Sequence, residues 1–402
     1  MLELSKLTRQ ADTMGAAVAR RRLDQHNLLQ RAQADLGQHA RVDDLLRQRI
    51  ARACAEDASW RGADPLGDSL DERHLPEGPP QPATLIAADG SQIYPDRHAV
   101  APYYLLNVGT ILLRQDAAEA PVVRSQPALF YEESDLYDET GRLRDSEYVN
   151  GQRHRLEFET LAQQAEEERA ALGGDVSRPI VALVDGPLLL WTAQRATDRE
   201  ISMEVRRFAR QLARFRGARV VPMGYVDRPA SANVLRTLEL ADISLEDVTR
   251  DKVRAGLYRR LTDRLLFSGL EPGQRSGLFA STSQMNGLLR DTGHRIIFFY
   301  LDASQRAGAD HAAIVRVEVP EWIASEPALL DLAHQAVYAD CRLTEYPYVL
   351  ARAHELAVVS TADRAEFEML VGQAMLRHGV PPVISTKAEM KRLTATRPRR
   401  HP

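Results

Sequence analysis

Cysteine is almost absent from this chain of 402 residues, in which Cys54 and Cys341 are the only two. Two cysteines so far apart in the sequence predict neither a disulfide framework nor a zinc site built from cysteine ligands. If the protein holds a metal ion, its ligands must therefore be oxygen atoms or histidine nitrogens.

An excess of positive charge is missing as well, since the formal net charge is −4 at pH 7. The total charge therefore gives no sign of nucleic-acid binding, which is clearest in a strongly basic domain. Only four of the 52 basic residues are lysines, so arginine dominates. Arginine forms bidentate hydrogen bonds to phosphate, although a GC-rich genome would give the same bias.

Long apolar stretches are also lacking. The longest are Tyr103–Leu113 and Ile180–Trp191, and both are shorter than the roughly 20 residues that a membrane-spanning helix needs. Residues 1–22 contain no apolar core of a secretory signal. Neither a P-loop nor a dinucleotide-binding glycine motif follows a strand. We therefore expect a cytoplasmic protein without a membrane segment and without ATP hydrolysis of its own.

The positions of apolar residues and helix breakers predict four parts. Residues 1–60 form a helical arm, because they lack proline as far as Glu56 and carry leucines at helical separations. Residues 61–82 are rich in proline and glycine and are expected to be a linker or surface loop. Residues 83–390 alternate strands and helices, as in an α/β domain. Residues 391–402 are expected to be a basic, disordered tail.

Within the α/β part, apolar runs predict strands and amphipathic runs predict helices. The strands are expected at 84–88, 100–113, 180–184, 218–225, 295–301 and 314–319, and the longer helices at 153–172, 200–217, 327–342 and 347–357. Residues 114–150 are polar, and residues 229–290 are expected to be mainly helical insertions and loops. The predicted fold is a mixed sheet flanked by helices.

Two apolar strands end in Asp-Gly, at Asp89 and again at Asp185. A carboxylate on the last residue of a strand points into a cleft, and the following glycine permits close approach of a substrate. Two such carboxylates could hold Mg²⁺ or Mn²⁺, which favour oxygen ligands. Each Asp-Gly could equally be an ordinary turn.

The helix expected from residue 153 carries several glutamates. Phe158 and Leu161 mark its apolar face, and Glu157 lies one turn before Leu161 at the border of that face. Glu157 is therefore expected to reach inward. The other glutamates of this helix are expected to face solvent, with the first of them kept as an alternative to Glu157; they are Glu159, Glu166, Glu167 and Glu168.

Several segments in a fixed order resemble the NurA nuclease family from about residue 84 to residue 391. They are 88–91 (Ala-Asp-Gly-Ser), 184–188 (Val-Asp-Gly-Pro-Leu), 224–229 (Gly-Tyr-Val-Asp-Arg-Pro), 272–276 (Pro-Gly-Gln-Arg-Ser), 298–301 (Phe-Phe-Tyr-Leu), 317–322 (Val-Glu-Val-Pro-Glu-Trp) and 346–355 (Tyr-Pro-Tyr-Val-Leu-Ala-Arg-Ala-His-Glu). One position departs from the family pattern, since Pro187 stands where the family usually has serine.

The resemblance implies a ribonuclease-H-like core and a DNA nuclease that processes DNA ends in double-strand break repair. It implies two Mn²⁺ or Mg²⁺ ions, a homodimer and a HerA-type hexameric ATPase as partner. Asp89 and Asp185 match the two strand-end metal ligands of the family, Glu157 matches its helical acid, and His354 matches the histidine of its C-terminal motif. A chain that keeps the fold but serves mainly as a DNA-binding adaptor for the ATPase is the alternative.

His354 could bind a metal ion or transfer protons near pH 7, or it could be a core histidine bonded to the backbone. A further group of side chains consists of candidates for contacts with DNA phosphates, for each of which a structural or surface role is the alternative. Its members are Tyr94, Arg228, Arg275, Arg352 and Lys387.

Overall fold

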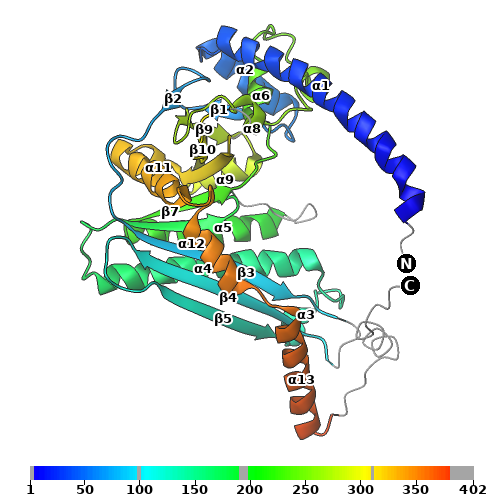
Figure 1. Ribbon diagram of the computed structural model, residues 1–402, viewed down its shortest axis with the longest axis vertical. Helices are drawn as coiled ribbons and strands as arrows, with labels where there is room; N and C mark the ends of the chain where they lie inside the picture. The colour runs from blue at the N-terminus through cyan, green and yellow to red at the C-terminus, as the bar shows by residue number, and fades with distance from the viewer. Residues whose placement is uncertain (1–3, 97–100, 190–197, 309–311, 381–402) are drawn as a thin grey trace. The chain divides into compact units, whose positions relative to one another are not determined.

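The computed structural model describes residues 4–96, 101–189, 198–308 and 312–380 (Figure 1). The chain forms two compact units. Unit 1 consists of Met1–Ala83 and Gly174–Tyr348, and unit 2 consists of Thr84–Gly173 and Val349–Pro402. Lys387 and the basic tail expected at 391–402 lie outside the described residues. No helix in the described ranges is long and apolar enough to cross a membrane.

Unit 1 is a mixed α/β unit. Its strands are β1 (Ala63–Pro65), β2 (Arg73–His74), β6 (Ile180–Asp185), β7 (Val220–Val226), β8 (Arg275–Ser276), β9 (Phe279–Ser281), β10 (Ile296–Asp302) and β11 (Ile314–Pro320). Its helices are η1 (Leu4–Leu7), α1 (Thr8–Gln38), α2 (Asp44–Glu56), α5 (Asp198–Gly217), α6 (Asn233–Leu238), α7 (Arg250–Ala255), α8 (Asp263–Leu266), α9 (Gln284–Asp291), α10 (Glu321–Ala324) and α11 (Pro327–Cys341).

The strands of unit 1 pair in the order β1-β9-β10-β11-β7-β6. β6 and β7 are parallel, whereas β10 and β11, and β11 and β7, are antiparallel. Every residue of β10 and β11 is buried, because helices such as α5 and α11 pack against this sheet. The continuous apolar runs of these strands are what burial on both faces requires.

The helical arm packs into unit 1 over part of its length. Leu36 on α1 and Ile50 on α2 are buried in a core cluster with Phe298 and Tyr300 of β10. The first half of α1 is exposed instead. Between the arm and unit 2, the segment 61–82 that was expected to be a linker contains the short strands β1 and β2 and the fully buried Leu70.

The described residues of unit 2 form three antiparallel strands and four helices. They are β3 (Thr84–Ile93), β4 (Tyr104–Arg114), β5 (Val122–Phe130), α3 (Glu133–Leu136), α4 (Ser146–Ala171), α12 (Tyr348–Ala357) and α13 (Thr361–Arg377). The strands pair in the order β3-β4-β5. β5 lies in the polar region 114–150, for which the sequence predicts no strand. The first six of its nine residues are all exposed.

A helix packs on each face of the β3–β4 pair (Figure 1). A Cβ at Gly90 of β3 would lie 2.4 Å from Glu157 Oε1 of α4. A Cβ at Gly109 of β4 would lie 2.4 Å from the backbone nitrogen of Ala357 in α12. Gly109 pairs with Asp89, the neighbour of Gly90, so these two glycines point to opposite faces. The two missing side chains allow α4 and α12 to approach the strands closely.

Candidate active site in unit 2

Asp89 lies inside β3, not at its end. The strand continues through Gly90 and Ser91 to Ile93 and stays paired with β4 throughout. The expected strand end after Asp89 is therefore wrong, because Gly90 serves the approach of α4 rather than a turn. Asp89 is 8% exposed and is held by a rigid, fully paired strand.

Two side chains beside Asp89 fix the position of α12. Ser91 Oγ donates a hydrogen bond to the carbonyl oxygen of Ala357. Asn107 Nδ2, on the neighbouring strand, donates to the same oxygen at 2.9 Å. These bonds satisfy a carbonyl at the C-terminal end of α12, where the last carbonyl groups have no N–H donor within the helix. They also fix the register of α12, and with it the place of His354, relative to Asp89.

His354 contacts Asp89 directly. The distance between His354 Nδ1 and Asp89 Oδ2 is 2.7 Å, and Asp89 Oδ1 accepts the backbone N–H of Gly90 at 2.8 Å. A carboxylate can only accept, so His354 Nδ1 carries the proton. The side chain of His354 is 66% exposed, so Nε2 is free to meet a substrate or a metal ion. The core-histidine alternative, with a bond to the backbone, does not fit this contact.

Glu157 reaches the same region from α4. Its side chain is 3% exposed and fills the space left by Gly90. Arg153, one helical turn earlier, donates to Glu157 Oε1 at 2.5 Å and to the carbonyl oxygen of Gly90 at 3.2 Å. The same nitrogen, Arg153 Nη1, lies 3.9 Å from Asp89 Oδ1. One guanidinium therefore joins two carboxylates that come from different elements.

Exposure separates the glutamates of α4. Glu157 is buried as the helical spacing predicts, and Glu159 is half-buried. The expectation that Glu168 faces solvent is wrong, because Glu168 is buried. Arg114 of β4 donates to both of its carboxylate oxygens, at 2.8 and 2.7 Å. Glu167 does face solvent, where the Arg124 guanidinium beside it lowers the pKa of its carboxyl.

The donors of this cluster suit a divalent cation. In the described ranges no three His, Cys, Asp or Glu side chains already form a metal-binding arrangement. Asp89, Glu157 and His354 nevertheless offer carboxylate oxygens and an imidazole nitrogen, the donor types that Mn²⁺ accepts. His154, whose Nδ1 lies 3.3 Å from Glu157 Oε2, is a further nitrogen at the same acid. The chemistry of these residues fits the ion that the sequence predicts.

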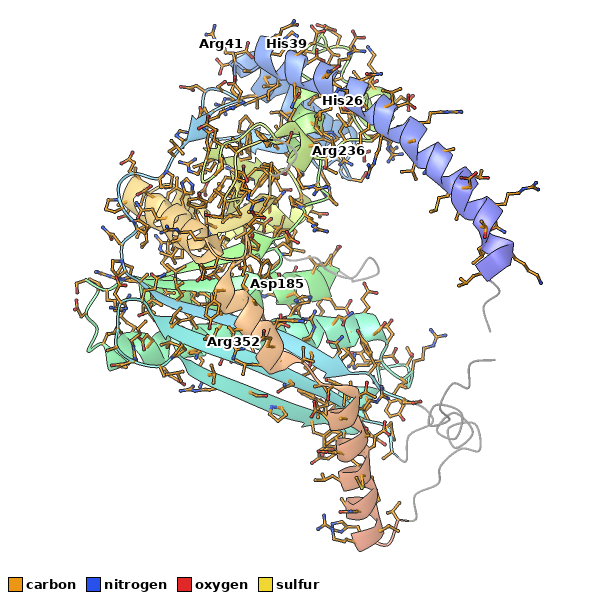
Figure 2. The ribbon with its side chains drawn as sticks, in the orientation of Figure 1. His26, His39, Arg41, Asp185, Arg236 and Arg352 are labelled. Atoms are coloured by element: carbon orange, nitrogen blue, oxygen red, sulfur yellow. The ribbon has the colours of Figure 1, made fainter. Side chains whose placement is uncertain are left out.

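Asp185 belongs to unit 1 and ends β6, as the sequence predicts (Figure 2). Its strand is buried up to this residue, and Asp185 itself is exposed. Gly186 follows, and its N–H donates to the carbonyl oxygen of Tyr225 on β7 at 2.8 Å. Asp185 is therefore a carboxylate at the carboxyl end of a parallel strand, where ligands gather in α/β sheets.

The candidates for DNA contacts lie in different surroundings. Tyr94 is exposed in unit 2, where its hydroxyl donates to Asn150 Oδ1 at 2.8 Å. Arg352, on α12, pairs with Glu355 (Figure 2). In unit 1 the side chain of Arg228 is 82% exposed. Arg275 is held inside unit 1 against the Phe299 ring, and burial lowers its pKa.

Arg153 was not identified from the sequence. The signal available was its position four residues before Glu157 on the same helix, a spacing at which opposite charges meet. That spacing is common on solvated helices, so it does not by itself indicate a site. Only the close approach of α4 at Gly90 makes this pair part of the cluster.

Comparison with known proteins gives one family match and several distant structural likenesses. The NurA domain matches residues 83–359. No curated protein sequence matches the chain. Among solved structures, the chain is similar to the NurA nuclease from Sulfolobus solfataricus, with 11% identity, 82% of this chain and 92% of the other covered, and a TM-score of 0.43.

Two further structures are less similar. The catalytic domain of human Endonuclease V shares 14% identity over 87% of this chain and 98% of its own, with a TM-score of 0.30. Drosophila Piwi shares 12% identity over 68% of this chain and 29% of its own, also with a TM-score of 0.30. The domain match spans well over half of the sequence and includes Asp89, Glu157, Asp185 and His354, so the chain belongs to the NurA family.

Proposed function

We propose that this protein is a metal-dependent DNA nuclease with a ribonuclease-H-like core. The observation that carries the proposal is the cluster in unit 2, where Arg153 Nη1 contacts both Asp89 and Glu157 while His354 contacts Asp89. Buried carboxylates are costly unless positive charge compensates them, and these two share the single guanidinium of Arg153. Membership of the NurA family supports the same activity.

Asp89, Glu157, Asp185 and His354 would hold Mn²⁺ or Mg²⁺, with two ions per site. When bound, such ions polarise a phosphodiester and make water a better nucleophile. Asp185 is included because it ends β6 as an exposed carboxylate and because of the sequence resemblance.

The protein side chains would orient the ligands and move protons. Asp89 accepts from His354 Nδ1 and so leaves Nε2 as the basic nitrogen. A histidine held this way can bind the cation through Nε2 or exchange a proton with the departing oxygen of the strand. Arg153 keeps two acids close together against their mutual repulsion.

The proposed setting is DNA end processing in double-strand break repair, in the cytoplasm. We propose a homodimer that docks on a HerA-type hexameric ATPase and acts as a 5′-3′ exonuclease and single-strand endonuclease. The exposed first half of α1, with Met14, Val18 and Leu23 open to solvent, is a surface that such an assembly could cover. Light scattering of the chain alone and mixed with the ATPase measures both assemblies.

The test of the activity is degradation of end-labelled DNA with Mn²⁺, Mg²⁺ or a chelator, with and without the ATPase. Cleavage is expected with the metal ions and not with the chelator. Asp89→Asn keeps the shape and a hydrogen-bonding oxygen for Gly90 N–H but removes the charge, so cleavage should fall on the order of 100-fold. Labels at either strand end distinguish the polarity.

Asp138→Asn is the matched control. Asp138 is a half-buried carboxylate of unit 2 that, in the described ranges, accepts hydrogen bonds only from its own turn, from Thr140 and Arg142. This variant should cleave like the natural chain. If the natural chain binds DNA and the ATPase but never cleaves with either metal, the protein is an adaptor and the proposed activity is wrong.

A further inference from the structure

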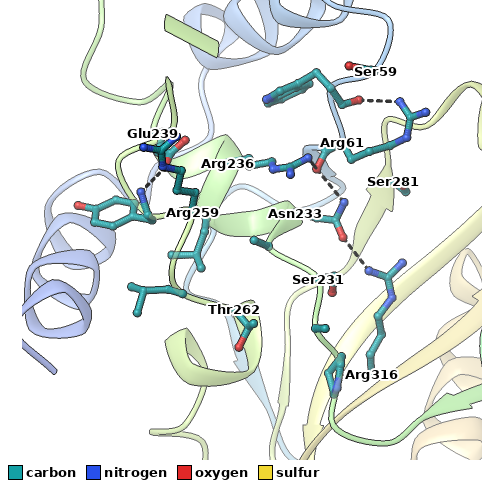
Figure 3. Close-up of a pocket in the computed structure, with 18 of the residues that line it drawn as sticks. Ser59, Arg61, Ser231, Asn233, Arg236, Glu239, Arg259, Thr262, Ser281 and Arg316 are labelled. Atoms are coloured by element: carbon teal, nitrogen blue, oxygen red, sulfur yellow. Dashed lines mark hydrogen bonds between the residues drawn. The ribbon is translucent and has the colours of Figure 1, made fainter. Parts of the chain in front are cut away.

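A cavity of about 690 Å³ lies within unit 1, remote in sequence from the acids of unit 2 (Figure 3). Residues 57–61 after α2, the segment 226–239 that includes α6, the segment 253–262 and β11 contribute its walls. Its lining is unusual in charge. Six arginines line it against three carboxylates: Arg61, Arg236, Arg254, Arg259, Arg260 and Arg316, and Asp57, Glu239 and Glu318.

All three carboxylates of the cavity have partners. Arg254 Nε donates to Asp57 at 2.7 Å, and this bond lowers the pKa of the Asp57 carboxyl. Arg316 lies 2.7 Å from Glu318, which also accepts the N–H of Leu189 at 2.8 Å. Two of the six arginines are therefore already neutralised.

The third carboxylate, Glu239, does not neutralise an arginine through an ion pair. It accepts the backbone N–H of Tyr258 at 2.5 Å, and burial raises its pKa. Burial disfavours its charged form, whereas the backbone donor and the nearby Arg236 charge favour it. The lining therefore keeps an excess of positive charge.

Four arginines form no ion pair in the parts of unit 1 that are described, although the charge of Arg236 acts on Glu239 from a distance: Arg61, Arg236, Arg259 and Arg260. Arg61 donates only to the carbonyl oxygens of Ala58 and Trp60, at 2.9 and 3.1 Å. Arg236 reaches only the carbonyl oxygen of Arg61, at 3.5 Å. Figure 3 shows Arg61, Arg236 and Arg259 around the same space. Backbone carbonyls do not cancel a full charge, so these guanidiniums repel one another.

Uncharged polar side chains accompany the arginines. The hydroxyl oxygen of Thr262 is buried in the wall and has no hydrogen-bond partner. Asn233 is held rigidly, since its Nδ2 donates to the carbonyl oxygen of Arg61 at 2.9 Å and its Oδ1 accepts from Arg316 Nη1 at 2.9 Å. A buried hydroxyl without a partner is costly unless a ligand completes it. This lining of guanidiniums and a buried hydroxyl suits an anion with several acceptor oxygens.

We propose that this cavity binds the phosphate group of a nucleotide. Phosphate offers several acceptor oxygens and up to two negative charges, which match planar guanidinium donors and a hydroxyl. The nucleotide is either the terminal one of a DNA strand or a free nucleoside monophosphate. The choice of a nucleotide rests on the proposed function, whereas the need for a phosphate-like anion rests on the cavity alone.

The experiment measures binding in the presence of a chelator, so that no cleavage occurs. The probes are inorganic phosphate, thymidine 5′-monophosphate, and one single-stranded oligonucleotide with either a 5′-phosphate or a 5′-hydroxyl. The variant is Arg236→Gln with Arg259→Gln. Both side chains are exposed at the cavity and belong to no ion pair in the described ranges, so the fold should be unaffected.

The matched control is Arg207→Gln with Arg290→Gln. These arginines are also exposed and also belong to unit 1, and the loss of charge is the same, but neither lines the cavity. The cavity variant should bind the phosphate probes about tenfold more weakly or worse, as expected for lost hydrogen bonds to a charged group. The control pair should change binding less than twofold.

The probes separate the two sources of the phosphate. If the 5′-phosphate of the oligonucleotide adds affinity that the cavity variant removes, the strand end is the ligand. If the cavity variant weakens binding of thymidine 5′-monophosphate but not of the 5′-phosphorylated oligonucleotide, the free nucleotide is the ligand. Equal affinities of natural chain, variant and control for every probe overturn the proposal. Absence of metal-dependent cleavage overturns the proposed nuclease and leaves this binding result in place.

Discussion

The acid cluster of unit 2 and the arginine-lined cavity of unit 1 have charge imbalances of opposite sign. In unit 2, two buried carboxylates share one guanidinium, that of Arg153. In unit 1, six arginines line a cavity with three carboxylates, and one of these three is bound to a backbone N–H. The first cluster is short of positive charge and the second is short of negative charge. The difference indicates a cation as the ligand of one cluster and a phosphate as the ligand of the other.

The two regions also differ in how rigidly and how deeply their charged side chains are held. Asp89 and Glu157 are buried and held by a paired strand and by the close contact at Gly90. The unpaired arginines of the cavity are mostly exposed, on long side chains. A buried, fixed donor set suits a small ion with strict geometry. Flexible cationic side chains suit a larger and more variable anion such as a strand end.

The largest expected effect comes from breaking the acid cluster. Glu157→Gln removes a charge in contact with Arg153, while the amide fills the same volume. Metal-dependent cleavage should fall on the order of 100-fold, as for loss of a group that holds a catalytic ion. Initial rates on end-labelled DNA with Mn²⁺ measure the effect.

Glu167→Gln is its control on the same helix. Glu167 is exposed and pairs with Arg124 at the surface, at 3.0 Å. Exposed pairs of this kind contribute little, so cleavage should stay within about twofold. If Glu167→Gln is the more damaging change, the helical acid of the site has been assigned to the wrong face of α4.

A second prediction concerns the close contact between β3 and α4. Gly90→Ala places a Cβ 2.4 Å from Glu157 Oε1 and 2.9 Å from Arg153 Cγ, so both side chains must move. Overpacking of this kind costs about 2 kcal/mol. We expect thermal stability to fall by several degrees and cleavage to fall about tenfold, because Glu157 and Arg153 move away from Asp89.

Gly151→Ala is the control for that substitution. Gly151 lies inside α4, and a Cβ there would meet no atom within 4 Å. Alanine in a helix interior is favoured over glycine by about 0.5–1 kcal/mol, so this variant should be slightly more stable and fully active. Equal melting temperatures for the two variants would show that α4 does not approach β3 as closely as the structure has it.

A third prediction removes the guanidinium that distinguishes the two clusters. Arg153→Gln leaves Asp89 and Glu157 without their shared counter-charge, so they repel one another. In chelator the melting temperature should fall. Mn²⁺ should then raise it by more than it raises that of the natural chain, because the ion replaces the missing charge. An equal or smaller rise in the variant would mean that the ion does not bind at these acids.

The sequence predicts the buried parts of the fold well, for a physical reason. β6, β10 and β11 are buried on both faces and therefore read as continuous apolar runs. β5 was missed because its side chains are mostly exposed, so its sequence, Val-Val-Arg-Ser-Gln-Pro-Ala-Leu-Phe, lacks the continuous apolar run of a buried strand. α13 was missed for the same reason, since none of its residues is buried.

The candidate site shows a similar limit. Helical spacing predicts that Glu157 faces inward, and it does. The same local reasoning misplaces Asp89 at a strand end, because Asp-Gly is a common turn, and it misses Arg153 altogether. What Gly90 does depends on α4, a helix that begins 56 residues later in the chain. Contacts of such long range have no local signature.

The last prediction concerns stability in acid rather than cleavage, and it sharpens the comparison because the titrating group, His334, lies in unit 1. His334 on α11 is buried against Phe299, and its Nε2 bonds to the carbonyl oxygen of Gly273 at 2.8 Å. Burial, with the nearby Arg275 charge, lowers the pKa of His334 to about 4.

Above the usual histidine pKa of about 6.5, His334 is neutral in the folded and in the unfolded chain, so it adds no pH dependence to the stability. Between about pH 6.5 and 4 only the unfolded chain binds the proton, so stability is lost as the pH falls. The loss is at most about 1.4 kcal/mol per pH unit. His334→Gln can keep a donor for Gly273 without titrating, so it should be less stable at pH 7.5 and should lose less stability on acidification. The measurement is the melting temperature of the natural chain and of His334→Gln from pH 7.5 to 4. The difference between the two should become smaller as the pH falls. Parallel curves would show that His334 does not govern acid stability.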